Sequence, residues 1–199
     1  SKRPTWKKQP RNSNKPWKRL KSMVTPSETT VSDGQPERGA GAAPSKIVSG
    51  GQSGVDRAAL DVAIKLGIRC GGWVPKGRRA EDGPIDSAYP MTETQSSGYE
   101  DRTHRNVVDS DATLIITRGA PDGGTKVTVD EAATLGKPYH IVDMMRTHSP
   151  LAALRWLESK RPNVLNVAGP RESKAPGIYD EASTFLTHLM NLAAGSRGA

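Results

Sequence analysis

The sequence has few cysteines, few aromatic side chains and no long apolar run. One cysteine, Cys70, excludes an internal disulfide, and no Cys/His cluster has the spacing of metal ligands, so we expect no metal. No apolar run approaches the roughly 18 residues that span a bilayer, and no signal-peptide segment is visible. We therefore expect a protein of a reducing compartment, cytoplasmic or organellar with the mitochondrial matrix included, neither secreted nor embedded in a membrane.

Positive charge is concentrated at the start of the chain. Residues 1–45 hold ten Lys or Arg against three acids, a net of +7 out of +8 for the whole chain. The remainder is close to neutral, so the basic character belongs to a tail and not to a folded domain. We expect three regions: a basic extended arm and Ser/Gly/Pro-rich linker over 1–45, a folded domain over 46–193, and a short tail over 194–199.

The arm itself, residues 1–21, has nine basic residues and no acid. Its prolines disfavour a continuous helix, so an extended segment is expected. Cations interleaved with tryptophans suit RNA, because cations neutralise phosphates and indole rings stack on bases. A solvated tail and a remnant of an import signal are the alternatives. The candidate nucleic-acid residues are Lys2, Arg3, Trp6, Lys7, Lys8, Arg11, Lys15, Trp17, Lys18, Arg19 and Lys21.

The folded part is organised around residues 46–66, KIVSGGQSGVDRAALDVAIKL. A short β-branched run leads into three glycines, and apolar residues then recur at helical spacing, which predicts a strand, a tight turn and a helix. Glycines let a ligand approach the backbone, and the free amides of a helix N-terminus favour an anion. The spacing is neither the dinucleotide GxGxxG nor the P-loop pattern, so a mere tight connection is the alternative.

Strands and helices alternate along the rest of the chain. We expect further strands near 68–74, 111–117, 139–143 and 164–167, and further helices near 97–108, 126–135, 150–159 and 178–192. This order predicts a doubly wound, Rossmann-like parallel sheet of about five strands. In such a sheet the strand-to-helix turns share one edge, so GGQSG, RGAPDGGT and AGPRES are expected together there, as an anion site.

Three local patterns are explained by structure alone, without a ligand. Arg57, Asp61 and Lys65 are spaced by four residues and are expected to form ion pairs on a solvated helix face. Residues 75–84 mix both charges and read as a surface loop, whose bases could instead reach an anion held by the first turn. Cys70 is expected to be a small buried apolar residue.

Four segments together resemble the putative molybdenum carrier family: GGQSGVDRAALDVAI, GGWVPKGRRAEDGPI, TLIITRG with its following GGT, and NVAGPRES with PGIY. That family is related to the Rossmann-like ligand binders that include the Lonely Guy enzymes and the DNA-processing protein A domain. The resemblance runs from about Lys46 to Leu192. It implies a Rossmann-like domain that carries a phosphorylated small molecule, molybdopterin cofactor or a nucleotide, without turning it over.

The resemblance also implies which residues bind the ligand. The phosphoribohydrolases of the wider group have a GGxGT turn followed by Glu, whereas this chain reads GGTKVTVDE, so their activity is not carried over. Ser53 stands where the family pattern has Thr, which keeps the hydroxyl. The candidate ligand-binding residues are Gly50, Gly51, Gln52, Ser53, Gly54 and Asp56 in the first turn, Lys76, Arg78 and Arg79 as a basic wall, Arg118, Gly123, Gly124 and Thr125 in the second turn, and Gly169, Pro170 and Arg171 in the third.

Two other functions stay open. The domain could be a structural subunit of a large ribonucleoprotein such as an organellar ribosome, anchored to RNA and to other proteins by the arm. A nucleotide hydrolase that uses the same edge of the sheet is the third hypothesis, with Glu81 or Asp82 as a candidate base.

Overall fold

A computed structural model describes residues 41–146 and 149–196, so the predicted basic arm lies outside the described residues. The strands of the main sheet are β1 (Lys46–Val48), β2 (Arg69–Val74), β5 (Met91–Glu93), β6 (Ala112–Thr117), β7 (Tyr139–Asp143) and β8 (Val164–Ala168). The helices are α1 (Val55–Lys65), α2 (Tyr99–Val108), α3 (Gly123–Thr134), α4 (Pro150–Lys160) and α5 (Ile178–Gly195). A short antiparallel hairpin, β3 (Arg79–Ala80) with β4 (Gly83–Pro84), lies between β2 and β5.

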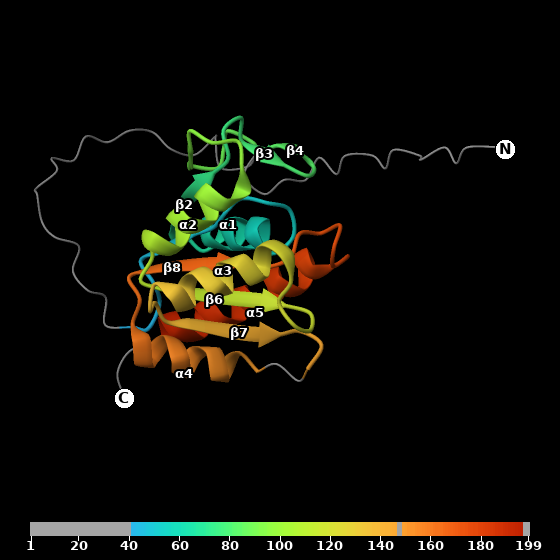
Figure 1. The fold of residues 1–199 in the computed structure, drawn as a ribbon. Coiled ribbons are helices and arrows are strands. Elements are labelled where there is room, and N and C mark those ends of the chain that lie inside the picture. The colour runs from blue at the N-terminus through green and yellow to red at the C-terminus, as the bar shows by residue number, and fades with distance from the viewer. Residues whose placement is uncertain (1–40, 147–148, 197–199) are drawn as a thin grey trace, which may run out of the picture. The chain divides into compact units, whose positions relative to one another are not determined.

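The six strands form one parallel sheet in the order β5-β2-β1-β8-β6-β7 (Figure 1). This confirms the predicted Rossmann-like α/β fold. Five of the six strands were expected from their apolar runs. The sixth, β5, is only three residues long and reads Met-Thr-Glu, which gives no apolar pattern, so the sequence analysis missed it.

Helices cover both faces of the sheet. Apolar side chains of α1, α4 and α5 pack with inward residues of β1, β6 and β8 in one large core cluster. Figure 1 shows α2 and α3 on the other face, in front of the strands. The strand β6 is buried along its whole length, as its continuous apolar sequence predicts for a strand covered on both faces.

The ends of the predicted elements shift by a few residues. Ser149 caps α4 by accepting a hydrogen bond from the Leu151 amide, and Pro150 is its first residue, as expected. Helix α3 begins at Gly123, three residues before the expected start, because Gly-Gly-Thr forms its first turn and glycine has low helix propensity. At the other end of the domain, Ala42 is already buried in the core, so the packed chain begins before Ser45.

Strand order reverses around β8, which lies between β1 and β6. The chain leaves β1 through α1 toward β2 on one side, and leaves β6 through α3 toward β7 on the other. In open parallel sheets, ligands bind outside the carboxyl ends of the strands at this reversal point. The topology therefore predicts a ligand site at the turns after β1, β6 and β8.

Candidate functional site

A cavity of about 420 Å³ opens at this reversal point. The turns after β1, β6 and β8 line it together with the first part of α2. Its lining residues are Gln52, Asp56, Tyr99, Glu100, Arg102, Thr103, Asp122, Gly123, Gly124, Thr125, Val127, Thr128, Ala168, Gly169, Pro170, Arg171 and Lys174. The volume lies in the lower part of the range of about 300 to 1,000 Å³ that is usual for small-molecule sites.

Three amides in and just after the first turn have acceptors inside the protein. The Gln52 amide donates to Asp56 Oδ2 at 3.4 Å, and the Ser53 amide donates to the side-chain oxygen of Gln52 at 3.0 Å. The Val55 amide at the start of α1 donates to the Pro170 carbonyl at 3.3 Å. The expectation that these amides face a ligand is therefore wrong for these three residues, because Gln52, Asp56 and the third turn already occupy them.

The glycines of the first turn serve close packing. A Cβ atom at Gly54 would lie 2.5 Å from the Pro170 carbonyl oxygen, so the third turn sits directly on the first. A Cβ atom at Gly50 would overlap the Arg102 guanidinium, which fills the space above that backbone. Here glycine permits approach by the protein's own groups.

The start of α3 is the second glycine-rich turn at the cavity. Among the described residues, none accepts a hydrogen bond from the amides of Gly123, Gly124 or Thr125, and the N-cap residue Asp122 makes no side-chain cap. All three residues line the cavity. Lys174 lies close by, with Nζ 2.9 Å from Asp122 Oδ2 and only 3.0 Å from the position of a Cβ at Gly123. A helix N-terminus with free amides beside an ammonium group can hold an anion.

A buried ion pair forms another part of the wall. Arg102 Nη1 lies 3.2 Å from Asp56 Oδ2, and the side chains are 15% and 3% exposed. Burial raises the pKa of Asp56 above its usual value, and Arg102 with the amides of Gln52 and Gly169 only partly offsets that effect. The Arg102 Nε atom is also buried and has no hydrogen-bond partner in the described part of the chain.

Glu81 joins the β3–β4 hairpin to two of the turns. Its carboxylate accepts hydrogen bonds from the hydroxyls of Ser53 and Ser173, and also from the Ser173 amide at 3.0 Å. Burial alone would raise the pKa of Glu81, but the hydrogen bonds from Ser173 and Ser53 outweigh it and hold the pKa below its usual value. This carboxylate is a clamp between loops and does not line the cavity.

Known proteins share the sequence and the fold of this domain. The sequence profile of the circularly permutated YpsA SLOG family matches residues 47–190. The chain belongs to this family. A crystal structure of a putative molybdenum carrier protein from Syntrophus aciditrophicus has 44% sequence identity and a TM-score of 0.72, and the match covers 74% of this chain and 95% of that one. A search of curated proteins found no match. The resemblance drawn from the four sequence segments is confirmed.

In this SLOG family member the structure brings half of the predicted ligand residues to the cavity. Those lining it are Gln52, Asp56, Gly123, Gly124, Thr125, Gly169, Pro170 and Arg171. Those not lining it are Gly50, Gly51, Ser53, Gly54, Lys76, Arg78, Arg79 and Arg118.

The predicted basic wall of Lys76, Arg78 and Arg79 lies outside the cavity lining. The Arg78 guanidinium donates to backbone carbonyls of its own loop, at 2.8 Å to Ile85 and 2.7 Å to Asp86, so it orders that loop. Lys76 and Arg79 are exposed and away from the cavity lining. Arg118 likewise forms a two-pronged pair with Glu181, at 2.6 and 3.1 Å, and donates to the Pro176 carbonyl.

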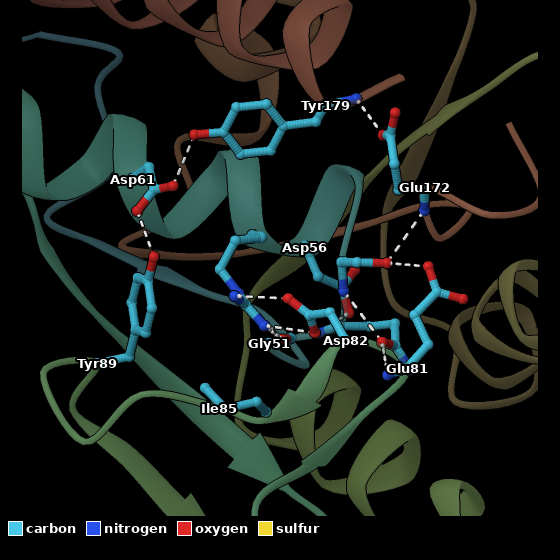
Figure 2. Close-up of polar contacts among 12 residues, drawn as sticks. Gly51, Asp56, Asp61, Glu81, Asp82, Ile85, Tyr89, Glu172 and Tyr179 are labelled. Carbon is cyan, nitrogen blue, oxygen red and sulfur yellow. Dashed lines mark hydrogen bonds and ion pairs between the residues drawn. The ribbon is translucent and has the colours of Figure 1, made fainter. Parts of the chain in front are cut away.

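The expected ion-pair face of α1 is wrong. Asp61 accepts hydrogen bonds from the Tyr89 hydroxyl at 2.6 Å and the Tyr179 hydroxyl at 2.7 Å (Figure 2). Arg57 instead donates to the Gly51 carbonyl at 3.0 Å and pairs with Asp82 at 3.4 Å. Cys70 is half-buried against the large core cluster and against a smaller one formed by Leu60, Val74, Ile85 and Tyr89, and burial raises the pKa of its thiol.

Sequence analysis missed Tyr99, Arg102 and Thr103 of α2 and Lys174 of the third turn. Arg102 reaches Asp56 over 46 sequence positions, and no local pattern encodes that pairing.

Among the residues that the structure describes, no group of three or more His, Cys, Asp or Glu could hold a metal ion. Within the same residues, no helix has the length and apolar character needed to cross a membrane.

Proposed function

We propose that this protein binds a phosphorylated small molecule in the cavity, with the phosphate at the start of α3. The observation that carries the proposal is the set of three free amides, Gly123 to Thr125, which line the cavity next to Lys174. Phosphates are held in this way at many helix N-termini. Arg171 and Arg102 also line the cavity, each paired with a carboxylate.

The family supports a small-molecule ligand, since a relative with 44% identity is named as a putative molybdenum carrier protein. Our candidates for the ligand are molybdopterin cofactor and a nucleotide. We propose binding and carriage, because the second turn lacks the GGxGT pattern with its following Glu. The phosphate site of this proposal is on α3, and the first turn contributes mainly by holding the third turn in place.

The test is a binding measurement with a matched pair of variants. Calorimetry with nucleoside monophosphates and a pterin phosphate should show binding to the wild type. Lys174→Ala should weaken it about tenfold, since the ammonium lies beside the free amides. Arg79→Ala, an exposed cation outside the cavity, should leave it unchanged. Equal losses in both variants, or binding to neither compound class, would overturn the proposal.

A second function is favoured by the sequence of the arm. Residues 1–21 carry nine basic residues and two tryptophans with no acid, so we propose RNA binding by the arm, with the domain as a scaffold in a larger assembly. Removal of residues 2–21 should abolish RNA binding and leave small-molecule binding unchanged. Wild-type RNA affinity should fall steeply as salt rises. RNA affinity that survives the deletion would reject this role for the arm.

A further inference from the structure

Two partly exposed large hydrophobic residues are among those that line the cavity. Tyr99, the first residue of α2, is 40% exposed, and Val127 of α3 is 41% exposed, and both line the cavity. Val127 is one helical turn beyond Gly123, about 6 Å along the axis of α3. The cavity therefore has a polar end at the start of α3 and an apolar end one turn away. A sugar or short linker can span such a distance between a phosphate and a ring.

The Tyr99 ring is supported by charged groups of the same wall. The Arg102 guanidinium carbon lies 5.8 Å from the ring centroid, within the range of a cation–π contact. Arg102 is in turn fixed by its ion pair with Asp56. The buried Nε–H of Arg102 has no acceptor among the described residues, so the wall that carries Tyr99 contains an unsatisfied hydrogen-bond donor.

The charge of the cavity lining limits the number of phosphates that a ligand can carry. The lining carries three cations, Arg102, Arg171 and Lys174, and three acids, Asp56, Glu100 and Asp122. Each cation pairs with an acid: Arg102 with Asp56, Lys174 with Asp122, and Arg171 with Glu81. The cavity therefore has no surplus positive charge for a triphosphate, while the free amides of α3 can serve a single phosphate.

We propose that Tyr99 and Val127 form a subsite for a flat heteroaromatic ring, and that the ligand carries this ring and one phosphate. This inference rests on the proposed function, since it uses the phosphate end at α3. Tyr99 is then the residue that determines specificity for the ring. Stacking of a ring on an aromatic side chain tolerates different ring types, so purines and pterins both fit the subsite.

The experiment compares ligands with and without the ring. Calorimetry on the full chain would use ribose 5-phosphate, adenosine and guanosine 5′-monophosphates, a pterin monophosphate and adenosine triphosphate. We expect at least one ring-bearing monophosphate to bind at least tenfold more tightly than ribose 5-phosphate and more tightly than the triphosphate. Tyr99→Ala should remove most of that tenfold gain without changing affinity for ribose 5-phosphate, and Tyr99→Phe should keep the gain.

The matched control is Tyr139→Ala, because Tyr139 is 39% exposed but lies on β7 outside the cavity lining. It should change no affinity. If ribose 5-phosphate binds as tightly as every ring-bearing monophosphate, the proposed ring subsite is wrong. The same holds if Tyr99→Ala keeps the full gain. Neither result contradicts the proposed phosphate site. Tighter binding of the triphosphate contradicts the single-phosphate limit. If none of the compounds binds, the phosphate site and the ring subsite both fail.

Discussion

The Asp56 carboxylate lies 3.2 Å from Nη1 of Arg102, and this pair joins the first turn of α1 to the middle of α2 at the cavity wall. Asp56 is 3% exposed, so removal of either partner leaves an uncompensated charge. We predict that Arg102→Met lowers the free energy of unfolding by about 3 kcal/mol. Urea denaturation measures this loss.

The control for that prediction is an exposed pair on the same helix. Arg105 Nε lies 2.9 Å from Asp101 Oδ1, with side chains 45% and 32% exposed. Asp101→Asn should therefore cost less than about 1 kcal/mol. Similar losses for Arg102→Met and Asp101→Asn would show that the buried pair has no special structural role.

Glu81 predicts a pH dependence of stability. Its pKa in the folded state is lowered, so the ionised carboxylate stabilises the fold above the unfolded value of about 4.5. This contribution is lost as pH falls from that value through the folded pKa. Glu81→Gln should reduce stability by about 1 to 3 kcal/mol at pH 7, and the difference from wild type should shrink below pH 4. A difference that is constant from pH 7 to pH 3 would contradict the clamp.

The hydrogen bonds from Tyr89 and Tyr179 to Asp61 predict that the fold loses stability at alkaline pH. Burial, followed by the hydrogen bond to Asp61, raises the pKa of both Tyr89 and Tyr179 above the usual 10. The folded state therefore keeps protons that the unfolded chain loses, and stability should fall as pH rises above 10. Tyr89→Phe and Tyr179→Phe should each cost about 1 kcal/mol at pH 8 and flatten this fall. Urea denaturation at pH 8 and pH 10.5 gives both quantities, and an equally steep fall in the variants would refute the assignment.

Asp122 predicts a gain in binding. Its carboxylate holds Lys174 at 2.9 Å and competes with a ligand phosphate for that ammonium. Asp122→Asn should raise the affinity for a nucleoside monophosphate two- to fivefold at low salt, with a smaller gain at high salt, because the pair is largely exposed. The control is Asp130→Asn on the same helix, where Asp130 pairs with Lys126 outside the cavity. Weaker binding in Asp122→Asn would mean that the carboxylate helps to hold the ligand.

Local patterns predicted much of the fold. The apolar run of β6 and the Ser149-Pro150 start of α4 are encoded within a few residues, and both are confirmed. The short strand β5 carries no such pattern, because its position depends on pairing with β2. The edge of the sheet that carries the cavity was likewise predictable from the alternation of strands and helices.

The detail inside the cavity was not predictable in the same way. Glycine-rich turns after β1 and β6 look alike in sequence, but Asp56 and Gln52 accept hydrogen bonds from two amides of the first, while no described residue accepts one from the amides of Gly123 to Thr125. Arg78 looks like a ligand-binding cation but binds carbonyls of its own loop. Such choices depend on contacts between residues far apart in the chain.

The central claim is that the ligand phosphate binds at the start of α3. The most direct measurement is a titration of the ¹⁵N-labelled protein with a nucleoside monophosphate, followed by amide chemical shifts. The account predicts that the largest phosphate-dependent shifts, shared by the ring-bearing compound and ribose 5-phosphate, fall on Gly123, Gly124 and Thr125. Largest shifts at Gly50 to Gly54, or at Lys76 to Arg79, would contradict it.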